Sequence, residues 1–450
     1  MKTLALLCTL LLFSMPAQAR DNILDIQEVK SKSGITAWLI EDNSVPVISL
    51  QFAFKGAGAR NDSAYKQGLS RLASNTMDEG AGDIPSQAFQ KTLRDNSITL
   101  FFNTTRDNFG GSLKTLTRNK AAAFELLRLA VNEPRFDDAP VARMIKANQA
   151  RIRNSLAKPG WIAARLMNDR GYEGHPYALN SGGTISTLST LTRDDLVQFQ
   201  EERLARNNLH IAVSGDISAN ELSKAIDDIF GALPKRANLS DTPALTLQNQ
   251  GNTYFYEKDI PQSFIEMLQP AIDRTHPDYH AAQIMNFILG SSGFGSRLTE
   301  EIREKRGLTY GIYSSIQSTD KFAGLSVSTS TQGENTPKML ELIRQEWVNM
   351  RNGISEEELQ NAKSYLIGSL PLSLTTTDSI AKTALSIKLD GLGSDYLDKR
   401  NNAIQDATLK DIQGIAEQLL NTEQFVTVIV GKQADGVDNA IVINEIPNAQ

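Results

Sequence analysis

Four histidines are the only imidazole side chains that this 450-residue chain could use for metal binding or acid–base chemistry. His276 and His280 have the i, i+4 spacing that places two metal ligands on one face of a helix. Pro277 favours a helix that starts between them and leaves His276 outside, and no glutamate stands nearby. His175 and His210 are isolated in the sequence. We therefore expect no metal centre at the histidines.

Other common catalytic arrangements are missing as well. Glycines at positions 290, 293 and 295 precede an expected helix and could cradle a phosphate, but no Lys-Ser/Thr pair follows the last of them. The chain has no Gly-x-Ser-x-Gly elbow, and its one cysteine, Cys8, lies close to the N-terminus. An independent hydrolase with an unrelated site is therefore a poor interpretation.

Residues 68–80 read Gly-Leu-Ser-Arg-Leu-Ala-Ser-Asn-Thr-Met-Asp-Glu-Gly. This stretch resembles the helix Gly-Leu-Ala-His-x-x-Glu-His-Met of the M16 (pitrilysin or insulinase) metallopeptidase family, in which both histidines bind zinc and the glutamate is the general base. At those three positions this chain has Arg71, Ser74 and Asn75. Arginine keeps its proton, and serine or asparagine replaces neither imidazole nor carboxylate at neutral pH. The resemblance therefore implies a zinc motif that has lost its function.

The third zinc ligand of the family is missing too. The resemblance places this glutamate roughly 75 residues after the second histidine, to complete a His₂Glu site. That count leads to Ala150 and Arg151, and no glutamate occurs between Glu133 and Glu173. The joint loss of all three ligands and the base indicates a non-catalytic paralogue that holds no metal or other cofactor.

A second family signature is intact. The segment from Asn286 to Tyr310 is similar to the C-terminal M16 segment, a glycine-rich loop and helix followed by an arginine and tyrosine pair, here Arg303 and Tyr310. In the family these side chains reach the zinc site of another half and contact the substrate backbone and the oxygen that becomes negative during attack. Without the resemblance, Arg303 would be read as part of a solvated helix face and Tyr310 as ordinary packing.

Keeping this pair while losing the zinc site is typical of the bacterial two-chain M16 enzymes. The resemblance then implies a zinc-free subunit that is inactive alone and completes the site of a catalytic homologue with an intact His-x-x-Glu-His motif. Zinc would be bound by that partner, and the substrate would be a peptide. The alternative is an inert binding or scaffold protein of the same fold, in which Arg303 and Tyr310 are vestigial.

Peptides bind M16 proteins by adding a strand to a sheet edge near the zinc helix. The resemblance makes Asn103, Thr104 and Thr105, which follow an expected strand, candidate substrate-binding residues. The same polar run is equally compatible with a turn at the end of a hairpin.

The N-terminus has the pattern of a secretory signal peptide. Met1 and Lys2 precede an apolar run over 4–13, and small residues at 17–19 suit cleavage, so we expect residues 1–19 to be removed and the protein to be periplasmic. No later apolar stretch is long enough to span a membrane. The net charge of −6 gives no indication of nucleic-acid binding.

Length and pattern predict an α+β protein of two related halves. The resemblance implies two homologous α/β sandwich domains in a clamshell arrangement, over 20–232 and 253–450, joined by a polar linker at 233–252. The expected strands are 35–40, 47–54, 97–103, 109–113, 209–215, 253–257, 263–269, 310–317, 324–331 and 425–431. The expected helices are one that starts near residue 68, followed by 120–131, 139–156, 219–230, 280–289, 336–349 and 356–369.

Overall fold

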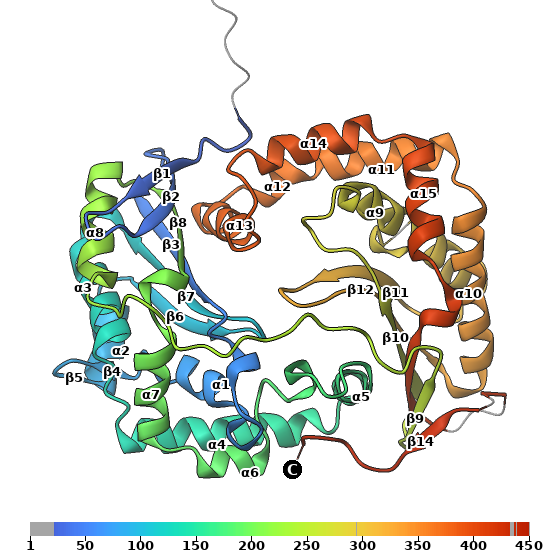
Figure 1. Ribbon diagram of the computed structural model, residues 1–450, viewed down its shortest axis with the longest axis horizontal. Coiled ribbons are helices and arrows are strands. Elements are labelled where there is room, and N and C mark those ends of the chain that lie inside the picture. Colours follow the sequence, from blue (N-terminus) through green and yellow to red (C-terminus); the bar gives the residue numbers. More distant parts are fainter. Residues whose placement is uncertain (1–21, 294, 433–435, 438, 450) are drawn as a thin grey trace, which may run out of the picture.

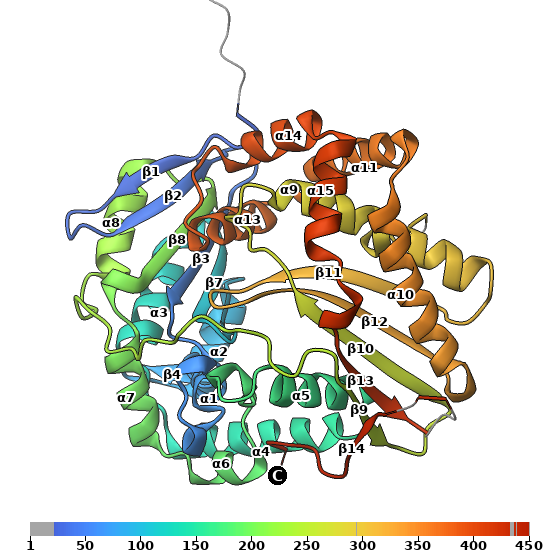
Figure 2. The same ribbon diagram turned by 45° about the vertical axis from the view of Figure 1, so that its right-hand side comes forward.

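The computed structural model describes residues 22–293, 295–432, 436–437 and 439–449, so the expected signal peptide at 1–19 lies outside the described residues. The chain forms two halves, each with a six-stranded sheet and a layer of helices, which face each other across the molecule (Figure 1, Figure 2). The predicted fold class is therefore confirmed. None of the described helices is both long and apolar enough to cross a membrane.

The first sheet has the strand order β1-β2-β8-β3-β7-β6. Its strands are β1 (Gln27–Lys30), β2 (Thr36–Glu41), β3 (Val47–Lys55), β6 (Thr99–Thr104), β7 (Asn108–Leu116) and β8 (Leu209–Gly215). Strands β2 and β8 pair in parallel, and all other neighbours pair antiparallel. A small hairpin of β4 (Gly80–Ala81) and β5 (Ile84–Pro85) forms a separate two-stranded sheet.

Helices α2 (Ser86–Asp95), α3 (Lys120–Asn132) and α8 (Ala219–Phe230) cover one face of this sheet (Figure 1). Their buried side chains join those of β3 and β7 in one apolar core. The α8 helix forms readily because Ser218 caps it and its apolar residues recur with helical period. The remaining helices of this half are α1 (Leu69–Ser74), α4 (Asp138–Ser155), α5 (Pro159–Gly171), α6 (Ile185–Thr190) and α7 (Arg193–Arg203).

The second sheet has the strand order β11-β12-β10-β13-β9-β14. Its strands are β9 (Thr253–Glu257), β10 (Gln262–Pro270), β11 (Ile312–Ser318), β12 (Ala323–Gln332), β13 (Val426–Gly431) and β14 (Ile441–Ile443). The helices of this half are α9 (Tyr279–Asn286), α10 (Thr336–Asn352), α11 (Glu356–Gly368), α12 (Leu370–Ser373), α13 (Thr377–Leu389), α14 (Tyr396–Asp406) and α15 (Leu409–Leu419). Two π-helical turns, η6 (Phe287–Ser291) and η7 (Thr299–Glu304), follow α9.

The two sheets repeat one topology. Reading the second sheet from β14 to β11 reproduces the first from β1 to β6, with β9 and β13 in parallel where β2 and β8 are in parallel. The outermost pair differs, because β14 runs parallel to β9 whereas β1 runs antiparallel to β2. The halves are thus two versions of one design, as the recurrence of strands and helices in the sequence predicts.

Each half lends one helix to the sheet of the other. Helix α13, from the second half, packs on β3 and β8 of the first sheet (Figure 1, Figure 2). Its first turn is fixed by a hydrogen bond of 2.8 Å between the hydroxyls of Ser49 and Thr377. At its other end, the Lys55 ammonium donates to the carbonyl of Leu389 at 2.7 Å. All strands of the first sheet come from the first half, but α13 on β3 and β8 comes from the second half.

Helix α5, from the first half, makes the reciprocal contact with β10 and β13. Its buried residues Ile162 and Leu166 belong to an apolar cluster with Leu268 and Val428 of the second sheet. Burying a side chain of this kind contributes about 1.5–3 kcal/mol. The exchange of α5 and α13 consequently joins the halves by apolar packing as well as by the covalent chain.

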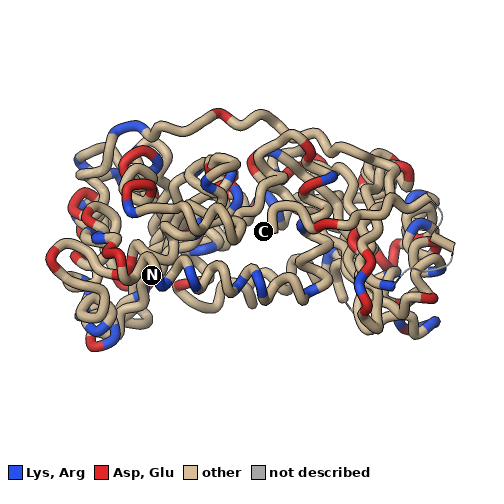
Figure 3. Tube along the Cα trace, turned by 90° about the horizontal axis from the view of Figure 1, so that it is seen from below, with Lys and Arg blue, Asp and Glu red and all other residues tan. Residues whose placement is uncertain are grey.

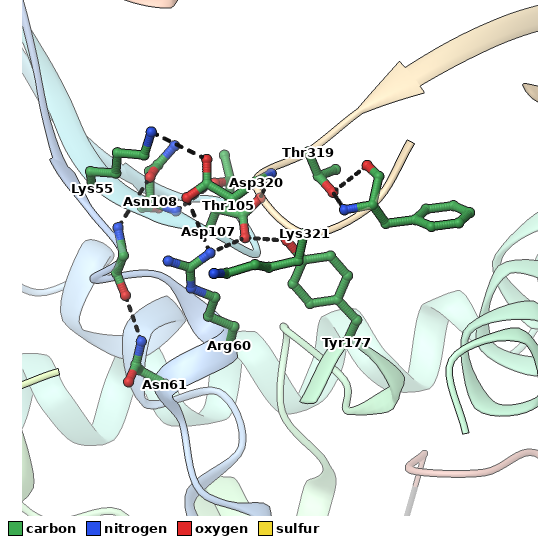
Figure 4. Close-up of polar contacts among 12 residues, drawn as sticks. Lys55, Arg60, Asn61, Thr105, Asp107, Asn108, Tyr177, Thr319, Asp320 and Lys321 are labelled. Carbon is green, nitrogen blue, oxygen red and sulfur yellow. Dashed lines mark hydrogen bonds and ion pairs between the residues drawn. The ribbon is translucent and has the colours of Figure 1, made fainter. Parts of the chain in front are cut away.

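A polar cluster also joins the halves, at the tip of the β11–β12 hairpin (Figure 4). The Arg60 guanidinium contacts Asp107 at 2.9 Å and Asp320 of the hairpin at 3.1 Å. The hydroxyl of Tyr177 donates to Asp107, and Lys55 lies 3.6 Å from Asp320. Two carboxylates are thus neutralised by two cations where the hairpin meets the first half.

Residues 231–252 connect α8 to β9 without a helix or strand of their own. Their second part is tied to both halves, since Leu245 donates its N–H to the carbonyl of Lys321 and Gln248 donates to that of Gly171. The last described residues return to the first half, where the side chains of Gln67 and Asn180 donate to Asn448. The chain therefore crosses between the halves several times.

Candidate functional site

The altered zinc-motif helix is α1, which is short and well fixed. It begins after Gly68, whose φ of +89° suits glycine. A Cβ at this position would lie 2.7 Å from the Cα of Gly183, so the close approach also requires glycine. Leu72 and Ala73 are fully buried on the inner side of α1. The backbone scaffold that would position zinc ligands is thus present.

The side chains on this scaffold offer no metal site. Arg71 is partly buried, and its Nε is buried without a hydrogen-bond partner. The hydroxyl of Ser74 donates to the carbonyl of Arg71 at 2.9 Å, within its own helix. The Oδ1 of Asn75 is buried without a partner. Among the described residues, no group of three His, Cys, Asp or Glu side chains is placed to hold a metal ion.

The position expected for the third ligand is on α4, which packs against α1. Arg151 of this helix is exposed and lies near enough to act on the charge of Arg71. Burial lowers the pKa of Arg71, and the like charge of Arg151 lowers it further. The structure therefore brings two cations together at positions where the family has a histidine and a glutamate.

The predicted substrate-binding residues lie at the end of β6, the edge strand next to α1. Asn103 and Thr105 are exposed and line a pocket of about 270 Å³ between β3, β7 and α13. Thr104 is buried, and its hydroxyl donates to the carbonyl of Thr105. The N–H of Thr105 and the carbonyl of Asn108 close the β6–β7 turn. The segment is thus both a strand edge and a hairpin turn.

The predicted pair Arg303 and Tyr310 lies in the second half and lines one pocket. This pocket has a volume of about 410 Å³ and is formed by Gln262, Arg303, Glu304, Gly307, Leu308, Thr309, Tyr310, Gln332 and Asn335. Tyr310 is 89% exposed, so its hydroxyl is accessible from solvent. The Nε of Arg303 lies 3.5 Å from a carboxylate oxygen of Glu304. The sequence reasoning thus identified two residues that the fold brings together.

The backbone between these two residues is firmly held. Arg303 lies in the last turn of η7, and its carbonyl accepts the N–H of Gly307, which has a φ of +64°. The carbonyl of Leu308 accepts the hydroxyl of Thr331 from β12 at 2.7 Å. Tyr310 is therefore presented by an anchored segment, although it precedes β11 and does not begin this strand as the sequence pattern predicts.

Sequence reasoning missed Glu266, an acid in the middle of β10. Burial raises its pKa to about 7, and no hydrogen bond to its side chain from the described residues opposes that rise. Nothing in the local sequence could have revealed this, because the burial comes from neighbouring strands and from the other half of the molecule. The polar cluster of Arg60, Asp107 and Asp320 was missed for the same reason.

Comparisons with known proteins agree with the geometry. Residues 190–366 match the family described as Peptidase M16 inactive domain. The chain is 25% identical over 398 residues to "Non-peptidase homolog YmxG" of Helicobacter pylori, covering 87% of this chain and 91% of the relative. It is 24% identical over 366 residues to "Probable inactive metalloprotease YmfF" of Bacillus subtilis, covering 76% of this chain and 84% of the relative.

A crystal structure of a peptidase M16 inactive domain from Pseudomonas fluorescens has the same fold. It superposes with a TM-score of 0.86 and 26% identity, over 91% of this chain and 99% of that one. These two relatives and this structure are described as inactive or non-peptidase proteins. The chain is thus similar to the M16 peptidase family, and in particular to proteins of that family that are described as inactive or non-peptidase.

Proposed function

We propose that this protein is the exported, zinc-free subunit of a two-chain M16 peptidase, in which Arg303 and Tyr310 complete the zinc site of a catalytic partner. The carrying observation is that Tyr310 is almost fully exposed on an anchored segment, in the same pocket as Arg303, while α1 offers no metal ligands. A large, exposed aromatic side chain held by the backbone is suited to a contact with another molecule.

In this proposal the two side chains act on a peptide bond that the partner's zinc polarises. A phenol and a guanidinium both donate hydrogen bonds, and such donors stabilise the negative charge that develops on the carbonyl oxygen. Arg303 would also hold the peptide backbone in register, which lowers the entropic cost of attack. The general base and the metal belong to the partner.

The periplasm is part of the proposal. The N-terminal pattern of a charged residue, an apolar run and small residues supports export. The only cysteine lies in that segment, so the part beyond it forms no disulfide and relies on its apolar cores.

The test mixes the purified chain with a catalytic M16 homologue that has an intact His-x-x-Glu-His motif. Alone, the chain should contain no stoichiometric zinc and cleave no peptide. In the mixture, Tyr310→Phe should lower kcat roughly 10- to 1000-fold, because a single oxyanion donor is lost. Arg303→Ala should raise KM and lower kcat. Gel filtration should show unchanged assembly for both variants.

Tyr313→Phe is the matched control. Tyr313 is also exposed, at 56%, but it lies on β11 and does not line the pocket. It should leave kcat within about twofold of wild type. Wild-type turnover by Tyr310→Phe and Arg303→Ala in a verified complex would reject the shared site and favour the inert scaffold.

A further inference from the structure

Helix α13 and the face of β2, β3 and β8 that it covers are here called the joint. Seen from below, the halves lie at opposite ends of the molecule, and chain segments bridge them in the middle (Figure 3). Irregular segments at 374–376 and 390–395 connect α13 to α12 and α14, and the second contains Gly391, which has a φ of +71°. A helix with such a connection at each end is able to move as a unit.

A histidine lies in the surface that α13 covers. His210 of β8 pairs with Ala53 of β3, and residues paired across a sheet point to the same face. Ala53 packs with Leu385 of α13 in one apolar cluster, so His210 is on the face that α13 covers. The Nδ1 of its ring is buried and has no hydrogen-bond partner. A protonated imidazole donates from both nitrogens, so the joint is built for the neutral ring.

Two lysines lie beside His210. Lys55 follows the β3 partner of His210 by two residues, so both side chains are on one face of the sheet. The Lys55 ammonium donates to the carbonyl of Leu389, at the end of α13, at 2.7 Å. Lys388 of α13 places its ammonium 4.8 Å from the centre of the Trp38 ring, on the strand next to β8. A proton on His210 would therefore add a third cation to the joint.

The carboxylates near the joint are engaged with other groups. Asp320 of the β11–β12 hairpin favours a charged His210, but it already contacts Arg60 at 3.1 Å. Asp378 of α13 accepts from a glutamine of β3, and Asp390 accepts from an arginine of the second half. Burial and the two lysines together lower the pKa of His210 to about 4. The surroundings of His210 thus oppose its protonation while α13 is in place.

We infer that the joint is an acid-operated switch, in which proton uptake by His210 drives α13 off the first sheet. The imidazole then meets water, and the lysines are free to move away from it. The released helix stays with the second half, because the Arg274 guanidinium donates to Asp390 and Ser386 at 2.8 and 3.0 Å. Acid therefore uncovers one face of the first sheet and loosens the contact between the halves. This inference concerns the chain alone and does not depend on the proposed function.

The size of the effect follows from the proton balance. An exposed histidine has a pKa of about 6.5, whereas that of His210 beneath α13 is about 4. Below pH 6.5 the undocked state takes up a proton that the docked state lacks, so docking weakens as the pH falls. Between pH 7 and pH 5 the equilibrium constant for docking should decrease roughly 20-fold.

The experiment measures hydrogen–deuterium exchange of the full chain by mass spectrometry at pH 7 and pH 5, with rates corrected for the intrinsic effect of pH. The opening equilibrium constant for peptides from 377–389 should rise roughly 20-fold at pH 5. Peptides from α8 and α10 should keep their protection. A local measurement is needed because the raised pKa of Glu266 gives overall stability the opposite pH dependence in the same range.

His210→Gln keeps a neutral polar side chain at every pH and should reduce the change to less than about twofold. Lys388→Met removes one neighbouring cation, so α13 should open at a lower pH than in the wild type. This second variant tests the switch even where His210→Gln impairs folding. Lys382→Met is the matched control, since it removes an exposed charge from α13 and should keep the wild-type response.

Three results would overturn the inference. These are exchange in 377–389 that does not change between pH 7 and pH 5, a change that persists in His210→Gln or is unaltered in Lys388→Met, or an equal loss of protection in α8 and α10. Tyr310→Phe should leave the response of α13 unchanged, so failure here and failure of the proposed function remain distinguishable.

Discussion

At the scale of single residues, Glu266 is a side chain whose charged form is disfavoured by burial. It lies on β10 opposite Ser328 of β12 and Val428 of β13, in the middle of the second sheet. An ionised carboxylate without hydrogen-bond donors is poorly solvated there, so its pKa rises to about 7. The folded protein therefore holds a proton at pH values where the unfolded chain has released it.

This difference predicts a pH dependence of stability. A glutamate in an unfolded chain has a pKa of about 4.3. Between roughly pH 4 and pH 7 the unfolded chain therefore releases the proton that the folded protein keeps, so the free energy of unfolding falls as the pH rises. Glu266→Gln remains neutral throughout and should exceed the wild type by roughly 1–3 kcal/mol at pH 8. The advantage should nearly vanish at pH 4.5. Urea unfolding at the two pH values measures both quantities.

Glu257→Gln is the control for this measurement, because Glu257 is exposed at the end of β9 in the same sheet. It should change stability by less than about 0.5 kcal/mol at either pH. A Glu266→Gln protein that is less stable than the wild type at pH 8 would show that the carboxylate is ionised and useful in the fold.

At the scale of elements, the β11–β12 hairpin reaches the first half through its tip. Asp320 accepts from Arg60, and its own N–H donates to Asp107 at 3.2 Å. Arg60 and Asp107 are about 10% exposed, so their charges are poorly screened by water. Removing the charge of Asp320 would leave the partly buried guanidinium of Arg60 with one of these two carboxylates, that of Asp107.

We expect Asp320→Asn to destabilise the protein by about 1–2 kcal/mol, less than for a fully buried pair because some solvent reaches the cluster. A thermal melt should show a lower transition temperature. Asp241→Asn is the control, since Asp241 lies 4.0 Å from Lys321 of the same hairpin but is fully exposed, and it should have almost no effect. Equal transition temperatures for the two variants would mean that the ion pairs at the hairpin tip do not help to hold the halves together.

Elements with a strong local pattern could be predicted from the sequence. The bounds of β8, α8 and β9 agree with the predicted 209–215, 219–230 and 253–257, because each has a compact apolar run or a clear cap. Helices α5 and α13 were not predicted, since their apolar faces are directed to a sheet far away in the sequence. The start of β11 was misplaced by two residues, because Gly311 interrupts the run after Tyr310.

The same distinction applies to the site. Residue types at 71, 74 and 75 could be read directly, since ligand chemistry depends on identity and spacing. The exposure of Tyr310 and the lack of a hydrogen-bond partner for the buried Nε of Arg71 could not be predicted, because both depend on contacts across the fold. Local sequence indicates which groups are present, and long-range packing decides whether they have partners.

At the scale of the whole molecule, the exchanged helices make the halves dependent on each other. Lys235 and Arg236 are exposed in the connection, whereas Leu247 nearby is buried. Trypsin should therefore cut first at these two basic residues. Because α5 and α13 stay packed on the opposite sheets, the two fragments should remain together.

The measurement is limited proteolysis followed by two separations. A denaturing gel should show two fragments, and gel filtration without denaturant should show one species at the elution volume of the intact chain. Fragments that elute separately under native conditions would contradict the stabilising role of the exchanged helices. A first cut inside 209–230 would instead contradict the predicted linker.

The reciprocal packing of α5 and α13 also bears on how the chain is made. Synthesis runs from the N-terminus, and α5 is complete about 250 residues before β13, one of the two central strands of the sheet that it covers. Until β13 is made, the apolar face of Ile162 and Leu166 lacks Val428, which is part of its final packing. The first sheet thus gains its covering helix only after α13 is made, and α5 gains its full cover only after β13 is made, so neither half can finish folding early in synthesis.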